Sequence, residues 1–223
     1  MTARVLAIDV TGPGGGAALL VGDAMECGII PPAVARARDL VPEVSRLVRD
    51  AGLRIGDLQG IACAIGPGSF TGIRIGIATA ATLAYAAGLP VAGIGSLHGI
   101  AEAAPESEPE VVVALNARRE HVFAARFTRK DGQLLAEGDY RHMPAAELAA
   151  EIDPKTYVLG DARGAYPLLF ERFPGIDSAE VRPAAIARLG ARRFADGAGS
   201  APAELRPLYL RLSDPEIRRQ SRA

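Results

Sequence analysis

A glycine-rich segment between an apolar strand pattern and an uncharged helix pattern constrains the fold of this chain most strongly. Residues 66–76 read Gly-Pro-Gly-Ser-Phe-Thr-Gly-Ile-Arg-Ile-Gly. They follow the apolar run 60–65, which predicts a buried strand, and they lead into residues 75–85, which carry no charge. A strand, a glycine-rich turn and an apolar helix in this order are the layout of a phosphate-binding loop. The chain is therefore expected to contain an α/β unit.

The segment lacks the residues that phosphate-binding loops need. A Walker loop, GxxxxGK[ST], places a Lys against the phosphates, and no Lys follows Gly72. Gly66, Gly68 and Gly72 give GxGxxxG, which is one residue longer than the dinucleotide motif GxGxxG. Two interpretations stay open. Either the helix N-terminus, with Ser69 and Thr71, holds an anion through its backbone N–H groups, or the glycines only permit a tight strand-to-helix turn.

A second candidate site lies where the first predicted strand ends. The apolar run Val5–Ile8 is followed by Asp9 and, two residues on, by Thr11. This carboxylate and hydroxyl could position a metal-bound phosphate, and the alternative is an Asp that caps a turn. The three His residues are isolated, without HxxxH or HExxH spacing, so we expect no metal site and no cofactor.

Small residues recur at every fourth position along the predicted helix 70–87. They are Gly68, Gly72, Gly76, Ala80, Ala84 and Gly88. This spacing lets another backbone approach closely, and a helix that is apolar nearly all round must be buried nearly all round. A sheet can cover one side and the helix 39–51 another. The remaining side is expected to meet either another helix of the chain or a partner protein.

The order of predicted elements indicates two α/β domains side by side. Residues 1–105 begin with three strands, of which 17–21 and 25–30 form a hairpin. They continue with a helix capped by Asp39, a strand at 60–65, the helix 70–87, a strand at 90–94 and a helix from 96. The proline-flanked segment 105–109 predicts the boundary. Residues 106–212 form the second domain, with strands at 110–116, 120–128, 133–142 and 156–159 and helices at 144–151, 162–171 and 183–195, the last free to pack back on the first domain. Residues 213–223 are expected to fray.

Charge and hydropathy exclude some classes of protein. The 25 basic and 26 acidic side chains give a net charge of −1, which argues against nucleic-acid binding through bulk charge. Arg218, Arg219 and Arg222 form a small basic cluster that is typical of a solvated chain end. Glycines and Pro90 interrupt the uncharged stretch 75–101, so we expect no membrane span and a cytoplasmic protein.

Four segments together resemble the TsaB family, which is also called YeaZ. They are Val5–Asp9 with Thr11, the motif at 66–76, Leu-Asn-Ala-Arg-Arg at 115–119 and Pro-Leu-Tyr-Leu-Arg at 207–211. The resemblance implies two actin-like domains of the ASKHA, ribonuclease H-like type, the second reduced. It also implies a protein without catalysis of its own that binds the catalytic paralogue TsaD. With the ATPase TsaE, this pair supports threonylcarbamoyl transfer to tRNA. The resemblance further implies a homodimer when the chain is alone, and tRNA contact only through the complex.

The resemblance also assigns roles to particular residues. Helices of the first domain form the family's interface, which implies as partner-contacting residues Val44, Leu47, Gly72, Ile73, Gly76, Ile77, Ala80 and Ala84. The family's motif turn corresponds to Gly66, Pro67, Gly68, Ser69, Phe70, Thr71 and Arg74. Asp9 and Thr11 are left as candidates for a vestigial phosphate site. Asn116 stands where the family usually has Asp, which weakens a metal or nucleotide site further.

Two other functions are alternatives to the scaffold. One is a small ASKHA-type ATP-binding phosphotransferase that uses Asp9, Thr11 and the turn 66–72. The other is a metalloprotease, which the lack of a metal-ligand pattern disfavours.

Overall fold

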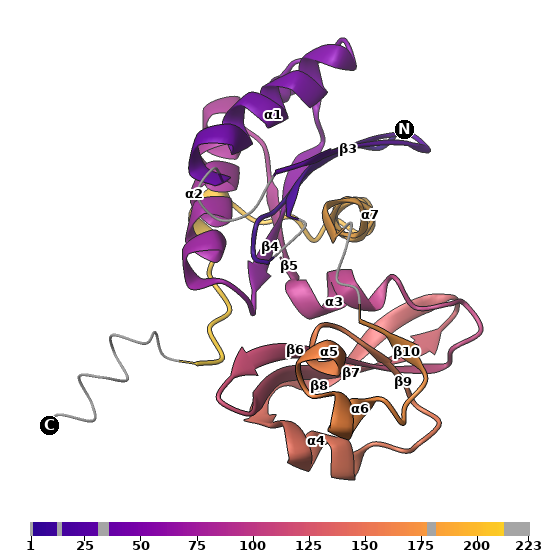
Figure 1. Cartoon of the computed structure of the whole chain (residues 1–223). Coiled ribbons are helices and arrows are strands. Elements are labelled where there is room, and N and C mark those ends of the chain that lie inside the picture. The colour runs from indigo at the N-terminus through magenta and orange to yellow at the C-terminus, as the bar shows by residue number, and fades with distance from the viewer. Residues whose placement is uncertain (1, 13–14, 31–35, 178–181, 212–223) are drawn as a thin grey trace, which may run out of the picture.

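The computed structural model describes residues 2–12, 15–30, 36–177 and 182–211, which form two five-stranded sheets with helices against them (Figure 1). The predicted α/β class is confirmed. The tail 213–223, with Arg218, Arg219 and Arg222, lies outside the described residues, as do Pro13 and Gly14 of the predicted glycine turn.

The first sheet has the strand order β3-β2-β1-β4-β5. Its strands are β1 (Arg4–Asp9), β2 (Gly16–Val21), β3 (Ala24–Ile29), β4 (Gly60–Gly66) and β5 (Val91–Gly95). The first three are antiparallel neighbours, and β1, β4 and β5 run parallel. The predicted hairpin is confirmed, and Gly22 supplies the positive φ of 61° that its tight turn requires. The carboxyl ends of β1, β4 and β5 therefore lie at one edge of the sheet.

Helices cover both faces of this sheet, as Figure 1 shows. Helices α1 (Arg36–Asp50) and α2 (Phe70–Ala87) lie on one face, over Leu6 and Ile8, while α7 (Arg182–Ala195) lies on the other, over Val5 and Ala7. Successive side chains of β1 thus point to opposite faces of the sheet, and both faces are buried. The short α3 (Ser96–Ala101) follows β5 and packs against α7 and the second sheet.

The start of α1 differs from the prediction. Asp39 was expected to cap the helix, but α1 begins at Arg36, which places Asp39 in its first turn. A carboxylate there still favours the helix through its dipole, so the capping pattern located the right region and the wrong residue.

The second sheet has the order β10-β9-β6-β7-β8. Its strands are β6 (Glu110–Arg118), β7 (His121–Lys130), β8 (Gln133–Pro144), β9 (Tyr157–Leu159) and β10 (Gly175–Ile176). Its helices are short, namely α4 (Ala145–Glu151), α5 (Ala162–Ala165) and α6 (Pro167–Phe170). The single helix expected at 162–171 is wrong, because Tyr166 leaves the helical region at φ −133° in front of Pro167.

The two sheets repeat one topology. Read from β8 to β10, the second sheet has the same order and the same antiparallel and parallel pairings as the first, with β6 in the place of β1. The linker 105–109 lies between them and contains no helix or strand. We propose a domain boundary at residue 105, which separates the strands of the first sheet from those of the second. Helix α7 follows this boundary in the sequence but packs on the first sheet.

Candidate functional site

The end of β1 carries a buried polar cluster. Asp9 and Thr11 are both buried, and the Asp9 Oδ1 atom accepts hydrogen bonds from the Thr11 N–H at 2.8 Å and from the Thr11 hydroxyl at 2.7 Å. The Thr11 Oγ1 atom also lies 3.1 Å from the hydroxyl of Ser96, the first residue of α3. Asp9 therefore caps a local turn, as one of the two sequence interpretations predicted.

The other carboxylate oxygen of Asp9 faces a cation of the same chain. The Arg182 Nε atom lies 3.3 Å from Asp9 Oδ2, and the side chains are 2% and 0% exposed. A Cβ atom on Gly12 would overlap the Arg182 guanidinium, so the arginine fills the space beside the strand end. Sequence analysis missed Arg182, since it is the first residue of α7 and nothing in its local sequence points to Asp9.

Arg182 also acts on the second sheet. Burial raises the pKa of Asp161 above its ordinary value, while the Asn116 N–H and the positive charge of Arg182 oppose that rise. Asp161 follows β9 and accepts the Asn116 N–H at 2.7 Å. The charge of Arg182 therefore acts on a carboxylate after a parallel strand in each sheet, Asp9 after β1 and Asp161 after β9. Open α/β sheets commonly bind ligands at such an edge.

The glycine-rich turn is built for close packing against the same strand end. The Ser69 N–H donates to the Thr11 carbonyl oxygen at 2.6 Å, and the Ser69 hydroxyl accepts the Gly72 N–H at 3.2 Å as the N-cap of α2. A Cβ atom on Gly72 would overlap the Val10 carbonyl oxygen. A Cβ atom on Gly68, whose φ is 158°, would likewise overlap the Thr11 carbonyl oxygen. The Ser69 and Gly72 N–H groups, which an anion could otherwise bind, are therefore used within the chain.

The segment at 207–211 joins the other two motifs. Tyr209 stacks on Phe70 with ring centroids 4.3 Å apart, and its hydroxyl accepts a hydrogen bond from Arg74 Nε at 3.1 Å. The Arg74 guanidinium lies 4.2 Å from the Phe70 ring centroid. Two residues on, Arg211 Nη1 donates to the Ala117 carbonyl oxygen at 2.9 Å. The sequence marked these motifs separately, and the structure brings all of them together.

The predicted partner-contacting residues lie mainly inside the chain. Seven of the eight are buried in the first domain, namely Val44, Leu47, Gly72, Ile73, Gly76, Ala80 and Ala84, and Ile77 is half-buried. The small-residue stripe of α2 faces the chain's own sheet, because Gly76 lies over Val10 and Cys63. The seven residues therefore pack within this chain, and their assignment to a partner interface stays a prediction.

The opposite face of α2 is exposed and apolar for much of its length. Its exposed positions are Thr71, Arg74, Ala78, Thr82, Tyr85 and Ala86. Tyr85 is 82% exposed, and no charged residue follows Arg74 in the helix. Among the described helices α2 is long and apolar enough to cross a membrane, but its buried stripe packs on the first sheet, which accounts for that composition within the fold.

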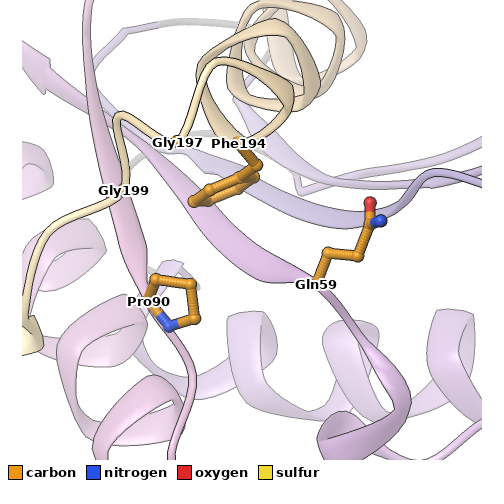
Figure 2. A pocket seen from close by; sticks show the side chains of 5 residues that line it. All are labelled: Gln59, Pro90, Phe194, Gly197 and Gly199. Carbon is orange, nitrogen blue, oxygen red and sulfur yellow. The ribbon is translucent and has the colours of Figure 1, made fainter. Parts of the chain in front are cut away.

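The rest of the described chain offers no stronger site. No group of three His, Cys, Asp or Glu side chains within it could hold a metal ion. An open cavity of about 340 Å³ lies at the other end of the first sheet, lined by Gln59, Pro90, Phe194, Gly197 and Gly199. Figure 2 shows Phe194 extending from the end of α7 toward the space between Gln59 and Pro90. This cavity has no titratable lining.

Comparisons with known proteins agree on one group. The family model "TsaD: tRNA N6-adenosine threonylcarbamoyltransferase" matches residues 21–160. An uncharacterized protein of Mycobacterium tuberculosis is 33% identical over 180 residues, covering 81% of this chain and 77% of that protein. The tRNA threonylcarbamoyladenosine biosynthesis protein TsaB of Bacillus subtilis is 29% identical and covers 80% of each. The structure of YeaZ from Pseudomonas aeruginosa superimposes with a TM-score of 0.80 at 26% identity, over 93% of this chain and 100% of that one.

Proposed function

Because the chain belongs to the TsaB (YeaZ) family and has the actin-like fold of two α/β domains, we propose that it serves tRNA threonylcarbamoyladenosine biosynthesis as a non-catalytic subunit. In this proposal it binds the catalytic relative TsaD in the cytoplasm. TsaE joins through that complex, and tRNA is reached only through the complex.

The observation that carries the proposal is the outward face of α2. An apolar helix face that is left in solvent commonly marks a protein–protein interface. Ala78, Thr82 and Tyr85 lie on that face at helical spacing, and α1, which contacts α2, carries the exposed Val41. A helix pair from a related domain could bury this surface. The same face would serve a homodimer when TsaD is absent.

The buried Asp9–Arg182 pair supports a role without phosphotransfer. A phosphotransferase would need the Asp9 carboxylate for a metal-bound phosphate, whereas Arg182 already neutralises it at 3.3 Å. Displacing that arginine would break a buried ion pair, which is costly. Calorimetry with ATP and magnesium separates the alternatives, since micromolar affinity that is lost in Asp9→Ala would favour the phosphotransferase.

Gel filtration of the chain mixed with its cognate TsaD tests the interface. Ala78→Arg adds a large cation to the centre of the exposed α2 face and is expected to abolish co-elution, because an unpaired charge would be buried. Ala150→Arg is the matched control, an exposed alanine near the end of α4 in the other domain. The control should co-elute with TsaD as the wild type does.

The variants must also keep the wild-type melting temperature, so that loss of the complex reports on contact rather than unfolding. A wild-type chain that never co-elutes with TsaD would refute the proposed role. A folded Ala78→Arg variant that co-elutes normally would refute only the assignment of this face.

A further inference from the structure

The turn between β6 and β7 holds three successive residues in the left-handed region. The φ angles are 66° at Arg118, 52° at Arg119 and 60° at Glu120. Residues other than Gly and Asn rarely adopt this backbone conformation, which costs roughly 1–2 kcal/mol per residue. Such strain persists only where the surroundings fix it, and it concentrates at functional sites.

Hydrogen bonds from several elements fix the turn. The Asn116 Oδ1 atom accepts from the Arg118 N–H at 2.7 Å and from the Tyr166 hydroxyl at 3.0 Å. The His121 Nδ1–H donates to the Arg119 carbonyl oxygen at 2.7 Å, and the Ala145 N–H donates to the Glu120 carbonyl oxygen at 2.8 Å. The turn therefore presents its side chains from a rigid support.

Two of these side chains are cations that form no ion pair among the residues that the structure describes. Arg118 and Arg119 are exposed, and neither guanidinium forms an ion pair with a described residue. Arg46 and Arg141, by contrast, are tied to carboxylates. Arg211 adds a third guanidinium, since it donates to the Ala117 carbonyl oxygen beside the turn. The whole chain has a net charge of −1, whereas this turn and its surroundings carry three arginines close together.

Aromatic rings lie next to these cations. The half-buried imidazoles of His121 and His142 stack with centroids 5.0 Å apart, and Phe123 lies 5.3 Å from His142. Burial lowers the pKa of His142, and the neighbouring His121 and Arg211 lower it further. Guanidinium groups beside flat rings are the combination that binds phosphate and stacks bases in RNA loops.

We propose that this turn, residues 118–121, contacts RNA in the assembled complex, with Arg118 and Arg119 on phosphodiester groups and His121 near an unpaired base. The inference rests on the proposed function, which supplies the RNA. The turn is joined to the α2 face through the segment 207–211, because Tyr209 stacks on Phe70 of α2 while Arg211 reaches Ala117. An RNA held by a partner on α2 would therefore pass close to the turn.

The test measures how the preassembled complex with cognate TsaD binds fluorescent tRNA across a series of salt concentrations. Arg118→Asn/Arg119→Asn removes two charges with a residue that tolerates the left-handed region. The matched control is Lys130→Asn/Lys155→Asn, which removes two charges at the opposite end of the second sheet, where β7 ends and β9 is about to begin. Arg118→Lys/Arg119→Lys keeps the charge.

Two phosphate contacts on single-stranded RNA predict a salt slope shallower by about 1.4 and an affinity roughly tenfold lower at 0.15 M salt for the Asn pair. The lysine pair should retain most of the slope, and the Lys130/Lys155 control should match the wild type. An Asn pair with wild-type slope and affinity would overturn the proposal. Equal losses in the control would also overturn it, because bulk charge would then explain both.

A different result would identify a protein occupant. If the Asn pair weakens assembly with TsaD but leaves the RNA affinity of the formed complex unchanged, the turn binds an acidic protein surface and the RNA proposal fails. If the wild-type chain does not assemble with TsaD, the proposed function fails instead. The same variants, compared as the chain alone at low salt, then still decide whether Arg118 and Arg119 bind RNA.

Discussion

The buried pair of Asp9 and Arg182 gives the sharpest prediction about stability. Arg182→Met removes the guanidinium and keeps an apolar side chain of similar length. The Asp9 carboxylate then keeps its hydrogen bonds from Thr11 but loses the cation that lies 3.3 Å away in a fully buried site. Breaking one partner of a buried pair typically costs about 3–5 kcal/mol, because the remaining charge is uncompensated.

That cost is a large part of the total stability of a chain of this size. Unfolding free energies of about 5–15 kcal/mol are usual, and about 1 kcal/mol shifts the melting temperature by roughly 2–4 °C for 150–250 residues. Arg182→Met should therefore melt roughly 6–20 °C below the wild type. Asp9→Asn, which retains an acceptor for Thr11 but removes the carboxylate 3.3 Å from Arg182, should lose a similar amount.

The double variant Asp9→Asn/Arg182→Met decides whether the ion pair is the cause. Replacing both charges leaves no buried charge, so the double variant should be more stable than Arg182→Met alone, with a coupling free energy of at least about 2 kcal/mol. Urea unfolding of the four proteins measures this cycle. Additive losses would refute the reasoning, since they would mean that the two side chains act separately through packing.

Two further predictions concern packing and pH. Gly72→Ala should lose about 1–3 kcal/mol, measured by urea unfolding, because its Cβ would overlap the Val10 carbonyl oxygen, whereas Gly56→Ala has open space and should be near neutral. Burial lowers the pKa of His98 despite the nearby Glu102, so the unfolded chain binds this proton more readily and stability should fall as the pH drops from about 7 to 5. His98→Gln should flatten that part of the profile, and an unchanged slope would show that other groups cause it.

The sequence predicted most elements of the fold because their patterns are local. The strands at 5–8 and 60–65, the hairpin and the helix 70–87 all appear in the structure. The direction in which α2 faces could not be predicted in the same way. Both faces of this helix are apolar, so periodicity identified the small-residue stripe at Gly76 and Ala80 but could not tell whether a sheet or a partner covers it.

The candidate site depended on contacts between distant parts of the chain. Asp9 and Thr11 were recognised as a cluster because they are neighbours, but Arg182 pairs with Asp9 only after the last helix returns to the first sheet. Tyr209 was part of a noted motif, yet its stacking on Phe70 required the folded chain. Side chains that come into contact from distant parts of the chain form no motif of fixed spacing, so a single sequence does not reveal them.

The repeated topology gives the two strand ends a common interpretation. At the end of β1, Asp9 Oδ1 accepts the Thr11 N–H at 2.8 Å, and at the end of β6, in the equivalent position, Asn116 Oδ1 accepts the Arg118 N–H at 2.7 Å. A nucleotide site of two such domains would need both ends to face a ligand. In this chain Arg182 meets the first side chain, and the second is a neutral amide bonded to Tyr166. Both strand ends use these polar groups within the protein, whereas Arg118 and Arg119, in the turn that follows β6, stay exposed.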